Sequence, residues 1–239
     1  MNPSKDFIVE EVDGFSIVRD DLFEGGTKAR VIGSYLDKYD EFDEYIYASP
    51  RMGYGQLSLT ICCNERGKKS TIFIPKGKHT WITEETIKIG GNIIEIPMGY
   101  LSVIQKRARD YSEENSKNHL MPFGFDNETI INEIGRISKN ISLEKEPTQV
   151  WSAISSGVLS RGLQLGFPNS EIMGVQVGHK TTEREQGRCK MYVSKYDFGR
   201  PCSIKERPPF PSNLNYDAKV WSIMKTHAKP NSLFWNCGR

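Results

Sequence analysis

The stretch that decides the fold runs from Val18 to Arg30 and reads VRDDLFEGGTKAR. An apolar run leads into a turn with two glycines, and a helical pattern follows, which places Lys28 in the first turn of a helix. The positive end of a helix dipole and the nearby edge of a sheet both favour a lowered amine pKa. A neutral amine is the form that an imine-forming lysine needs. Lys28 is therefore a candidate reactive lysine, although a solvated lysine on an ordinary first helix has the same pattern.

Outward from this stretch, strand-like runs alternate with helix-like segments along the whole chain. This alternation is typical of an α/β fold in which helices cover a parallel sheet. The expected strands are Phe15–Val18, Glu44–Ala48, Lys69–Pro75, Ile93–Pro97, His119–Met121, Gln149–Ala153, Glu171–Val177 and Ser232–Asn236. The expected helices are Lys28–Asp37, Gly55–Asn64, Glu84–Ile89, Tyr100–Asn115, Glu128–Ile141, Leu159–Leu165 and Asp217–Thr226. Such a fold binds ligands beyond the carboxyl ends of its strands, where the strand order reverses.

The segment from Gly178 to Tyr216 lacks clear periodicity, because charges, prolines and glycines interrupt it. An irregular insert, a lid and an oligomer contact all fit this composition.

Composition excludes several classes of protein. The 239 residues contain 32 basic and 30 acidic side chains, a formal net charge of +2, which is not the strong basic excess of a dedicated nucleic-acid binder. The five cysteines are scattered without a zinc-site spacing, so we expect no metal and a reducing compartment. The N-terminus has acids where a signal peptide has an apolar run, and no stretch is apolar for the ~20 residues of a membrane span. We expect a cytoplasmic protein without a membrane partner.

A second segment, Val150–Gly166, delivers serines and a glycine from an apolar strand to the start of a helix. Ser155, Ser156 and Gly157 would present backbone N–H groups and hydroxyls to one point, which suits a phosphate dianion. A serine N-cap before an ordinary amphipathic helix explains the same residues.

A third segment, Ala48–Thr60, reads ASPRMGYGQLSLT and again joins a strand end, a glycine-bearing turn and a helix. Its hydroxyls, its arginine and its early helical N–H groups suit a carboxylate or phenolic oxygen, although a plain surface turn also fits. The last segment, SLFWNCGR at Ser232–Arg239, is an apolar strand that ends at Cys237, and a buried structural thiol is the default interpretation. The predicted substrate-binding residues are Ser49, Arg51, Tyr54, Gln56 and, from the irregular segment, Tyr216.

Taken in order, these segments resemble the fold-type II pyridoxal-phosphate enzymes, especially the aminocyclopropane-carboxylate deaminase and D-cysteine desulfhydrase branch. VRDDLFEGGTKAR is similar to the branch pattern R-x-D followed by G-G-N-K-x-R, with Thr27 in place of asparagine. SSGVLSRGL is similar to the family's phosphate loop, and LMPFGFDN at Leu120–Asn127 to its P-x-G loop. The resemblance covers about Phe15 to Gly238.

The resemblance implies a two-lobed, open, twisted parallel-sheet architecture like that of the tryptophan synthase β subunit, with a reduced C-terminal part. It implies a small lobe at about residues 40–125 and a large lobe formed by residues 1–39 and 126–239. Lys28 would form the Schiff base with pyridoxal 5'-phosphate, and Cys237 would face the ring nitrogen. The implied phosphate-binding residues are Ser155, Ser156, Gly157, Val158 and Leu159.

The chain also departs from the family pattern. Pro50 or Gly53 stands where an asparagine usually meets the cofactor's phenolic oxygen, and Tyr54 stands where histidine is common. Val158 and Leu159 replace a glycine and a threonine, and the chain is shorter between Gly178 and Leu233. In that shortened part Tyr216 is the nearest substitute for the branch's active-site tyrosine.

Three functions remain open. The resemblance implies a lyase or deaminase that acts on a free amino acid or similar small amine. A lyase or decarboxylase that acts on an amino acid attached to a nucleotide or to DNA, as in viral DNA base modification, is a second possibility. The basic clusters Arg66–Lys69, Lys76–Lys78 and Lys106–Arg109 would then meet phosphates, although such clusters are more often solvated faces. A cofactor-binding protein with impaired catalysis is the third. We expect a homodimer in each case.

Overall fold

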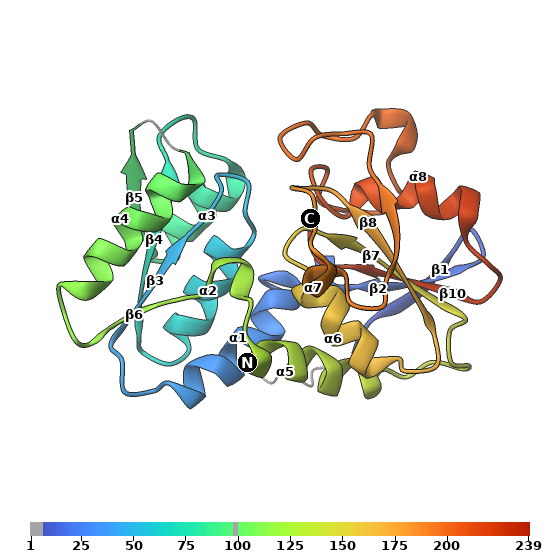
Figure 1. Cartoon of the computed structure of the whole chain (residues 1–239), viewed down its shortest axis with the longest axis horizontal. Helices are drawn as coiled ribbons and strands as arrows, with labels where there is room; N and C mark the ends of the chain where they lie inside the picture. The colour runs from blue at the N-terminus through green and yellow to red at the C-terminus, as the bar shows by residue number, and fades with distance from the viewer. Residues whose placement is uncertain (1–6, 98–99) are drawn as a thin grey trace. The chain divides into compact units, whose positions relative to one another are not determined.

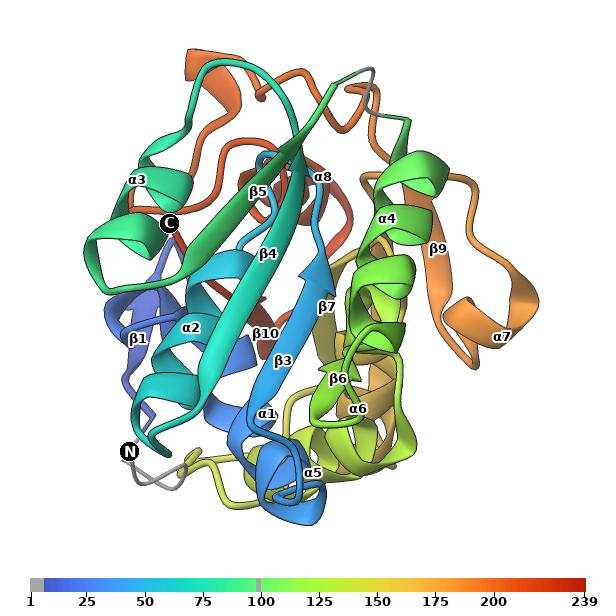
Figure 2. The ribbon, with the colours of Figure 1, turned by 90° about the vertical axis from the view of Figure 1, so that its left-hand side faces the viewer.

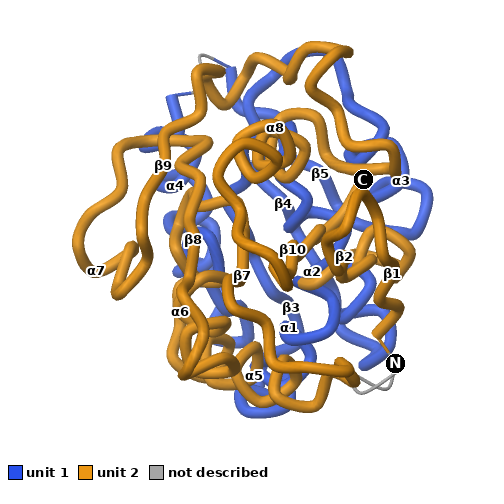
Figure 3. The backbone as a smooth tube through the Cα atoms, turned by 90° about the vertical axis from the view of Figure 1, so that its right-hand side faces the viewer, with its two compact units in different colours: residues 1, 28–125 blue, residues 2–27, 126–239 orange. Residues whose placement is uncertain are grey.

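The structure is a computed structural model that describes residues 7–97 and 100–239. It divides into two compact units (Figure 3). Among the described residues, unit 1 comprises residues 28–125 and unit 2 comprises residues 7–27 and 126–239. Residues 1–6 of the expected large lobe, and residues 98 and 99 of the expected small lobe, lie outside the described residues.

Unit 2 contains a six-stranded sheet and the helices around it. Its elements are β1 (Val9–Val12), β2 (Phe15–Arg19), the 3-10 helix η1 (Asp20–Leu22), α5 (Glu128–Lys139), β7 (Gln149–Ile154), α6 (Val158–Gly166), β8 (Glu171–Gln176), α7 (Glu183–Gln186), β9 (Lys190–Val193), the 3-10 helix η3 (Ile204–Glu206), α8 (Ala218–His227) and β10 (Ser232–Asn236). The strand order is β1-β2-β10-β7-β8-β9, and every pair is parallel except β1 with β2.

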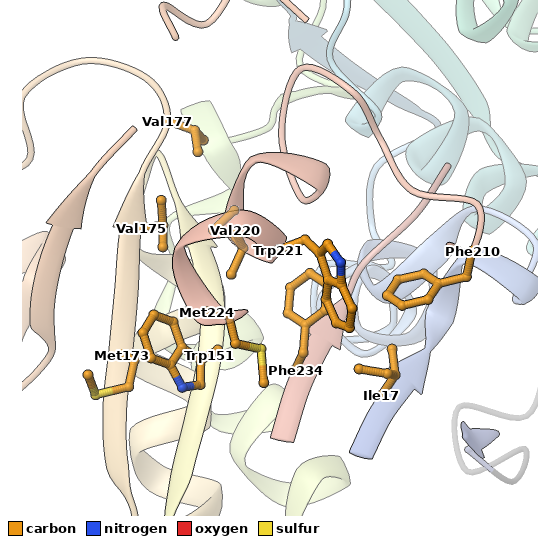
Figure 4. Close-up of a cluster of buried hydrophobic side chains, with 11 residues drawn as sticks. Ile17, Trp151, Met173, Val175, Val177, Phe210, Val220, Trp221, Met224 and Phe234 are labelled. Carbon is orange, nitrogen blue, oxygen red and sulfur yellow. The ribbon is translucent and has the colours of Figure 1, made fainter. Parts of the chain in front are cut away.

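The core of unit 2 lies between this sheet and α8 (Figure 4). Trp151 of β7 and Phe234 of β10 are fully buried, and Val220, Trp221 and Met224 of α8 pack against them. Helix α6 covers the other face of the sheet and packs on α5 (Figure 1). The central strands β7 and β10 are buried throughout because both faces of the sheet are covered there.

Unit 1 contains a parallel four-stranded sheet of order β5-β4-β3-β6. Its elements are α1 (Gly26–Lys38, whose first two residues belong to unit 2), β3 (Glu44–Ala48), α2 (Gly55–Asn64), β4 (Lys69–Pro75), α3 (Trp81–Lys88), β5 (Asn92–Ile96), α4 (Leu101–Glu113), β6 (Asn118–Leu120) and the 3-10 helix η2 (Phe123–Phe125). Helix α4 packs on one face of the sheet through Ile104 and Ala108, and α2 and α3 lie on the other (Figure 2).

Each sheet has one point where the strand order reverses. In unit 2 the chain runs outward from β7 to β8 and β9, and then returns to the other side of β7 as β10. In unit 1 it runs outward from β3 to β4 and β5, and returns beside β3 as β6. The loops after β7 and β3 therefore lie at the two places where α/β sheets bind ligands.

The α/β fold with parallel sheets is confirmed, and each expected strand and helix has a counterpart in the structure. Helix α3 begins at Trp81 rather than at Glu84, because the Thr80 side chain accepts a hydrogen bond from the Thr83 N–H and caps the helix earlier. The segment after Gly178, in which the sequence shows no clear periodicity, contains α7 and the edge strand β9. Strand β9 forms through its pairing with β8, and its four residues are too few to be recognised by their periodicity.

The boundary between the units falls between Thr27 and Lys28, so residues 28–39 belong to unit 1 rather than to the part expected to form the large lobe. Contacts within unit 1 explain this grouping. The Cys62 thiol donates to the Ala29 carbonyl at 3.3 Å, and the Tyr35 hydroxyl lies 2.8 Å from His119 Nε2.

Candidate functional site

The carboxyl ends of β2, β10 and β7 meet at one edge of unit 2 because these strands are parallel neighbours. Thr27 lies at this edge, 4 % exposed. Its N–H donates to the Cys237 carbonyl at 3.0 Å. Its hydroxyl donates to Asp20 Oδ2 at 2.6 Å and accepts from Trp235 Nε1 at 2.9 Å. Three strong contacts therefore fix the first turn of α1 against β10, and Lys28 is the next residue along that helix.

Cys237 lies among acidic groups and a phenol. Removal from water raises the pKa of its thiol well above the usual value, and the carboxylates of Asp217 and Asp20 raise it further. Burial also raises the pKa of Tyr216, and the hydroxyl of Tyr216 donates to the Ala153 carbonyl at the end of β7, at 3.2 Å. The thiol and the phenol are therefore both neutral at physiological pH.

A buried ion pair between Arg19 and Asp21 stabilises the carboxyl edge of the unit 2 sheet. Arg19, 7 % exposed, donates from Nε and Nη2 to the two carboxylate oxygens of Asp21, each at 2.8 Å. It also pairs with Glu10. Asn236 Nδ2 donates to Asp21 Oδ1 at 2.7 Å, which links the end of β10 to the turn before α1. A two-pronged arginine–carboxylate contact sets the orientation of both groups.

The loop between β7 and α6 has the predicted form. Gly157 is the N-cap of α6 with φ of +72°, and it contributes no side-chain cap to the helix. A side chain at Gly157 would have no space, because a Cβ there would lie 2.1 Å from the carbonyl oxygen of Glu185 in α7. Ser155 and Ser156 are half-buried, as is Leu159, whereas Val158 is buried. The N–H groups of the first turn of a helix have no partner within that helix, and here the cap residue has no side chain to satisfy them.

Two arginines hold α7 over this loop. Asp126 accepts from Arg161 of α6 at 2.6 Å and from Arg184 of α7 at 2.8 Å. Arg161 Nε also donates to the Gly157 carbonyl at 3.3 Å. Helix α7 was not predicted from the sequence, and the capping pattern T-x-x-E at Thr182–Glu185 is the sequence signal that indicates it.

In unit 1, Lys28 is half-buried in the first turn of α1, as predicted. Its Nζ lies 5.8 Å from the centre of the Phe125 ring, a distance at which a cation is attracted to an aromatic face. Phe125 stacks on Tyr47 at 4.4 Å and has an unusual φ of +60°. A non-glycine residue held in this conformation costs about 1–3 kcal/mol and is frequent at functional sites. Phe125 lies in the segment that resembled the P-x-G loop, but the sequence alone did not indicate its contact with Lys28.

The loop after β3 holds the other predicted residues. Gln56 is fully buried, and its side-chain amide donates to the carbonyls of Pro50 at 3.2 Å and Arg51 at 2.9 Å and accepts from Thr83 at 3.0 Å. Ser49 is also fully buried and donates to the Pro50 carbonyl at 2.9 Å. Gln56 and Ser49 thus hold the loop in shape, and their contact with a substrate stays a prediction.

Arg51 and Tyr54 are half-buried in the same loop. Arg51 Nη2 donates to the Lys76 carbonyl at 3.1 Å, which joins the loops after β3 and β4. The Tyr54 ring packs against Trp81. The structure thus brings Ser49, Arg51, Tyr54 and Gln56 together at the strand-order reversal of unit 1, and brings Tyr216 and Cys237 together at that of unit 2.

The groups at the unit 2 edge fit pyridoxal phosphate. The glycine cap and the first turn of α6 suit a phosphate, and the neutral Cys237 thiol suits the edge of a pyridine ring. Among the residues that the structure describes, no group of three or more His, Cys, Asp and Glu side chains is placed to hold a metal ion. None of the described helices combines the length and apolar character that crossing a bilayer requires.

The fold is that of the fold-type II pyridoxal-phosphate enzymes, which confirms the architecture implied by the resemblance. A solved structure of an ACC deaminase homologue superposes with a TM-score of 0.82 at 15 % identity, over 98 % of this chain and 89 % of that one. Threonine deaminase isoform 2 from Solanum lycopersicum gives 0.74 at 16 % identity, over 97 % and 83 %. A pyridoxal 5'-phosphate-dependent aspartate racemase gives 0.69 at 11 % identity, over 97 % and 89 %.

No protein-family model matches the chain, and no curated protein sequence matches it. At sequence identities this low, the superpositions establish a shared fold.

Proposed function

We propose that the protein is a pyridoxal-phosphate-dependent enzyme of the lyase or deaminase kind, which acts on the amine of an amino acid or a similar compound through Lys28. The observation that carries the proposal is the position of Thr27. Hydrogen bonds to Cys237, Asp20 and Trp235 fix this residue at the ligand-binding edge of unit 2, and Lys28 follows it directly in the chain. The ACC deaminase homologue and the threonine deaminase share this fold and support the reaction class.

In this proposal the residues of unit 2 hold the coenzyme. The first turn of α6, from Gly157 to Leu159, binds the phosphate with its N–H groups, aided by Ser155 and Ser156. Cys237 lies beside the ring nitrogen as a neutral thiol. The bound coenzyme supplies an electron sink for a bond to the substrate's α-carbon.

The remaining work belongs to Lys28 and to the loop after β3. Lys28 would hold the coenzyme through Nζ, and as a free amine the same nitrogen would be able to take a proton from the substrate's α-carbon. The loop from Ser49 to Gln56 orients the substrate carboxylate. Arg51 is the residue of this loop whose positive charge attracts that carboxylate. That orientation determines which bond of the substrate is broken.

A DNA-linked substrate is a weaker candidate because the formal net charge is only +2 and several residues of the basic clusters are engaged in contacts within unit 1. Arg66 pairs with Asp37 at 2.6 Å, Lys68 donates to the carbonyls of Asp40 and Phe42, and Lys106 pairs with Asp110 at 2.9 Å. Duplex binding relies on many free cations that neutralise phosphates. Salt-dependent retention on a DNA column tests this alternative.

The experiment that tests the proposal is mass spectrometry of purified protein treated with pyridoxal phosphate and borohydride. We expect one added coenzyme, located by peptide mapping at Lys28, and an absorbance band near the visible edge that the reduction removes. Lys28→Ala should abolish both signals.

Lys38→Ala is the matched control, since Lys38 ends the same helix and should not affect the labelling. Labelling of Lys28→Ala at the wild-type level, or a wild-type protein that takes up no coenzyme, contradicts the proposal. Labelling at Lys28 without turnover of any amino acid supports the third function, a coenzyme-binding protein with impaired catalysis.

A further inference from the structure

Unit 1 exposes a tryptophan at the carboxyl edge of its sheet. Trp81 is 45 % exposed, whereas Trp151 and Trp235 are fully buried and Trp221 is 3 % exposed. Trp81 begins α3, immediately after the loop that follows β4. Leaving so large an apolar ring in water forgoes the stabilisation that burying it would give. An exposed ring at the ligand-binding edge of an α/β sheet is therefore a candidate contact for a ligand.

Two neighbours extend this surface. The ring of Tyr54 meets that of Trp81 edge-on, with 5.8 Å between ring centres and 69° between ring planes. Met52, 36 % exposed, lies in the same loop as Tyr54. We call Met52, Tyr54 and Trp81 the aromatic surface. Arg51 fixes its two loops together by donating to the Lys76 carbonyl, and Thr80 donates to the Arg51 carbonyl at 3.3 Å.

Positive charge lies next to the aromatic surface. Lys76 and Lys78 are exposed in the loop between β4 and α3, and neither forms an ion pair within the described part of the chain. Glu95 is the acidic group at this loop, where it accepts from His79 at 3.3 Å and from the Gly77 N–H at 3.4 Å. The loop itself therefore has two lysines and one carboxylate contact, and Glu84 in the first turn of α3 is the next acidic side chain.

We propose that the aromatic surface binds a nucleotide, with the base stacked on Trp81 and the phosphate paired with Lys76 and Lys78. Given the proposed function, on which this last step rests, the nucleotide is the non-reacting part of the substrate. A planar base can stack on the exposed ring of Trp81, and a negatively charged phosphate can pair with the lysine ammonium groups. Two lysines without ion-pair partners among the described residues can neutralise one or two phosphates, whereas binding to a duplex requires contacts with many phosphates.

Tryptophan fluorescence measures this binding directly, because Trp81 is the exposed tryptophan. We expect adenosine 5'-monophosphate to quench the emission of the whole protein, and adenosine to quench it only at a concentration several-fold higher. Raising the salt concentration should weaken binding of the nucleotide but not of the nucleoside. Inorganic phosphate alone should compete weakly and leave the emission unchanged.

Variants separate the two contacts. Trp81→Ala should weaken nucleotide binding, measured by calorimetry, by roughly tenfold or more, as expected for loss of one base–aromatic stack. Lys76→Ala combined with Lys78→Ala should weaken binding several-fold and flatten its salt dependence. Lys88→Ala is the matched control, because Lys88 is an exposed lysine of α3 that pairs with Glu85. Thermal unfolding of each variant checks that it is folded.

Unchanged affinity in Trp81→Ala, or an affinity of the double lysine variant equal to that of Lys88→Ala, overturns the proposal. Absence of quenching by millimolar nucleotide overturns it as well. Lys28→Ala should bind the nucleotide normally while it loses the coenzyme label. Failure of nucleotide binding and failure of coenzyme attachment can therefore be told apart.

Discussion

The carboxyl edges of the two sheets differ in how their side chains are held. At the edge of unit 2, charged and polar groups such as Arg19, Asp21 and Thr27 are buried and bonded to one another. At the edge of unit 1, the loop after β3 is held mostly through backbone carbonyls, and Met52 and Trp81 remain exposed. Buried polar networks tolerate little change, whereas exposed loop residues can vary at low cost. In the proposed function, this difference would give a coenzyme site in unit 2 that tolerates little change and a substrate site in unit 1 that can vary.

The largest difference between the units should appear when an ion pair is broken. Asp21→Asn removes the carboxylate that faces the buried Arg19. Breaking a buried pair costs about 3–5 kcal/mol when the remaining charge has no partner, and because Glu10 still pairs with Arg19 we expect a loss near the lower end of that range. Asp37→Asn breaks the pair with Arg66, where Asp37 is 63 % exposed, and should cost less than about 1 kcal/mol. Urea unfolding of both variants measures the two free energies. Equal losses would show that burial does not distinguish the two ion pairs.

The next largest effect concerns glycine. Gly157→Ala should destabilise the protein by about 3 kcal/mol, because the new Cβ meets the Glu185 carbonyl in addition to adopting a positive φ. Gly67→Ala in unit 1 is the matched control, since Gly67 has φ of +63° and no atom within 4 Å of the added Cβ. It should lose only about 1 kcal/mol. Similar losses of stability in the two variants would mean that α7 does not pack closely against the loop at Gly157.

A smaller effect is expected at Thr27. Thr27→Val keeps the shape but removes the hydroxyl that bridges Asp20 and Trp235, at a cost of about 1–3 kcal/mol for the buried groups left without it. Thr27→Ser retains the hydroxyl and should lose less. If Thr27 positions Lys28, the valine variant should also attach the coenzyme more slowly, as followed by the borohydride-trapped label. A valine variant that is labelled at the wild-type rate would limit Thr27 to a structural role.

The smallest effect is the dependence of stability on alkaline pH. Burial raises the pKa of the Cys62 thiol to about 12, so the folded protein retains a proton that the unfolded chain loses near pH 9. Stability from this group is complete below pH 9 and declines as the pH rises toward 12. Between pH 8 and pH 10 the wild-type protein should lose about 1 kcal/mol more than Cys62→Ala, because the other buried thiols contribute equally to both. A wild-type protein and a Cys62→Ala variant with the same loss over that range would contradict this.

The sequence by itself determined the element order and the local position of the key residues. The run VRDDLFEGGTKAR predicts a strand, a glycine turn and a helix that begins near Lys28, and the structure has this arrangement. The turn at Gly157 was likewise predictable, because two serines and a glycine stand between an apolar strand and an amphipathic run. Such features depend on residues close together in the chain, so the sequence pattern contains them.

Only the tertiary structure decided which distant residues meet. Asp20 and Trp235 both bond to Thr27, yet they are separated by most of the chain, and the parallel pairing of β2 with β10 is what joins them. The packing of α7 on Gly157 and the exposure of Trp81 also depend on long-range contacts. Burial and partner choice are properties of the folded arrangement, because they are set by elements that the local pattern around a residue does not include.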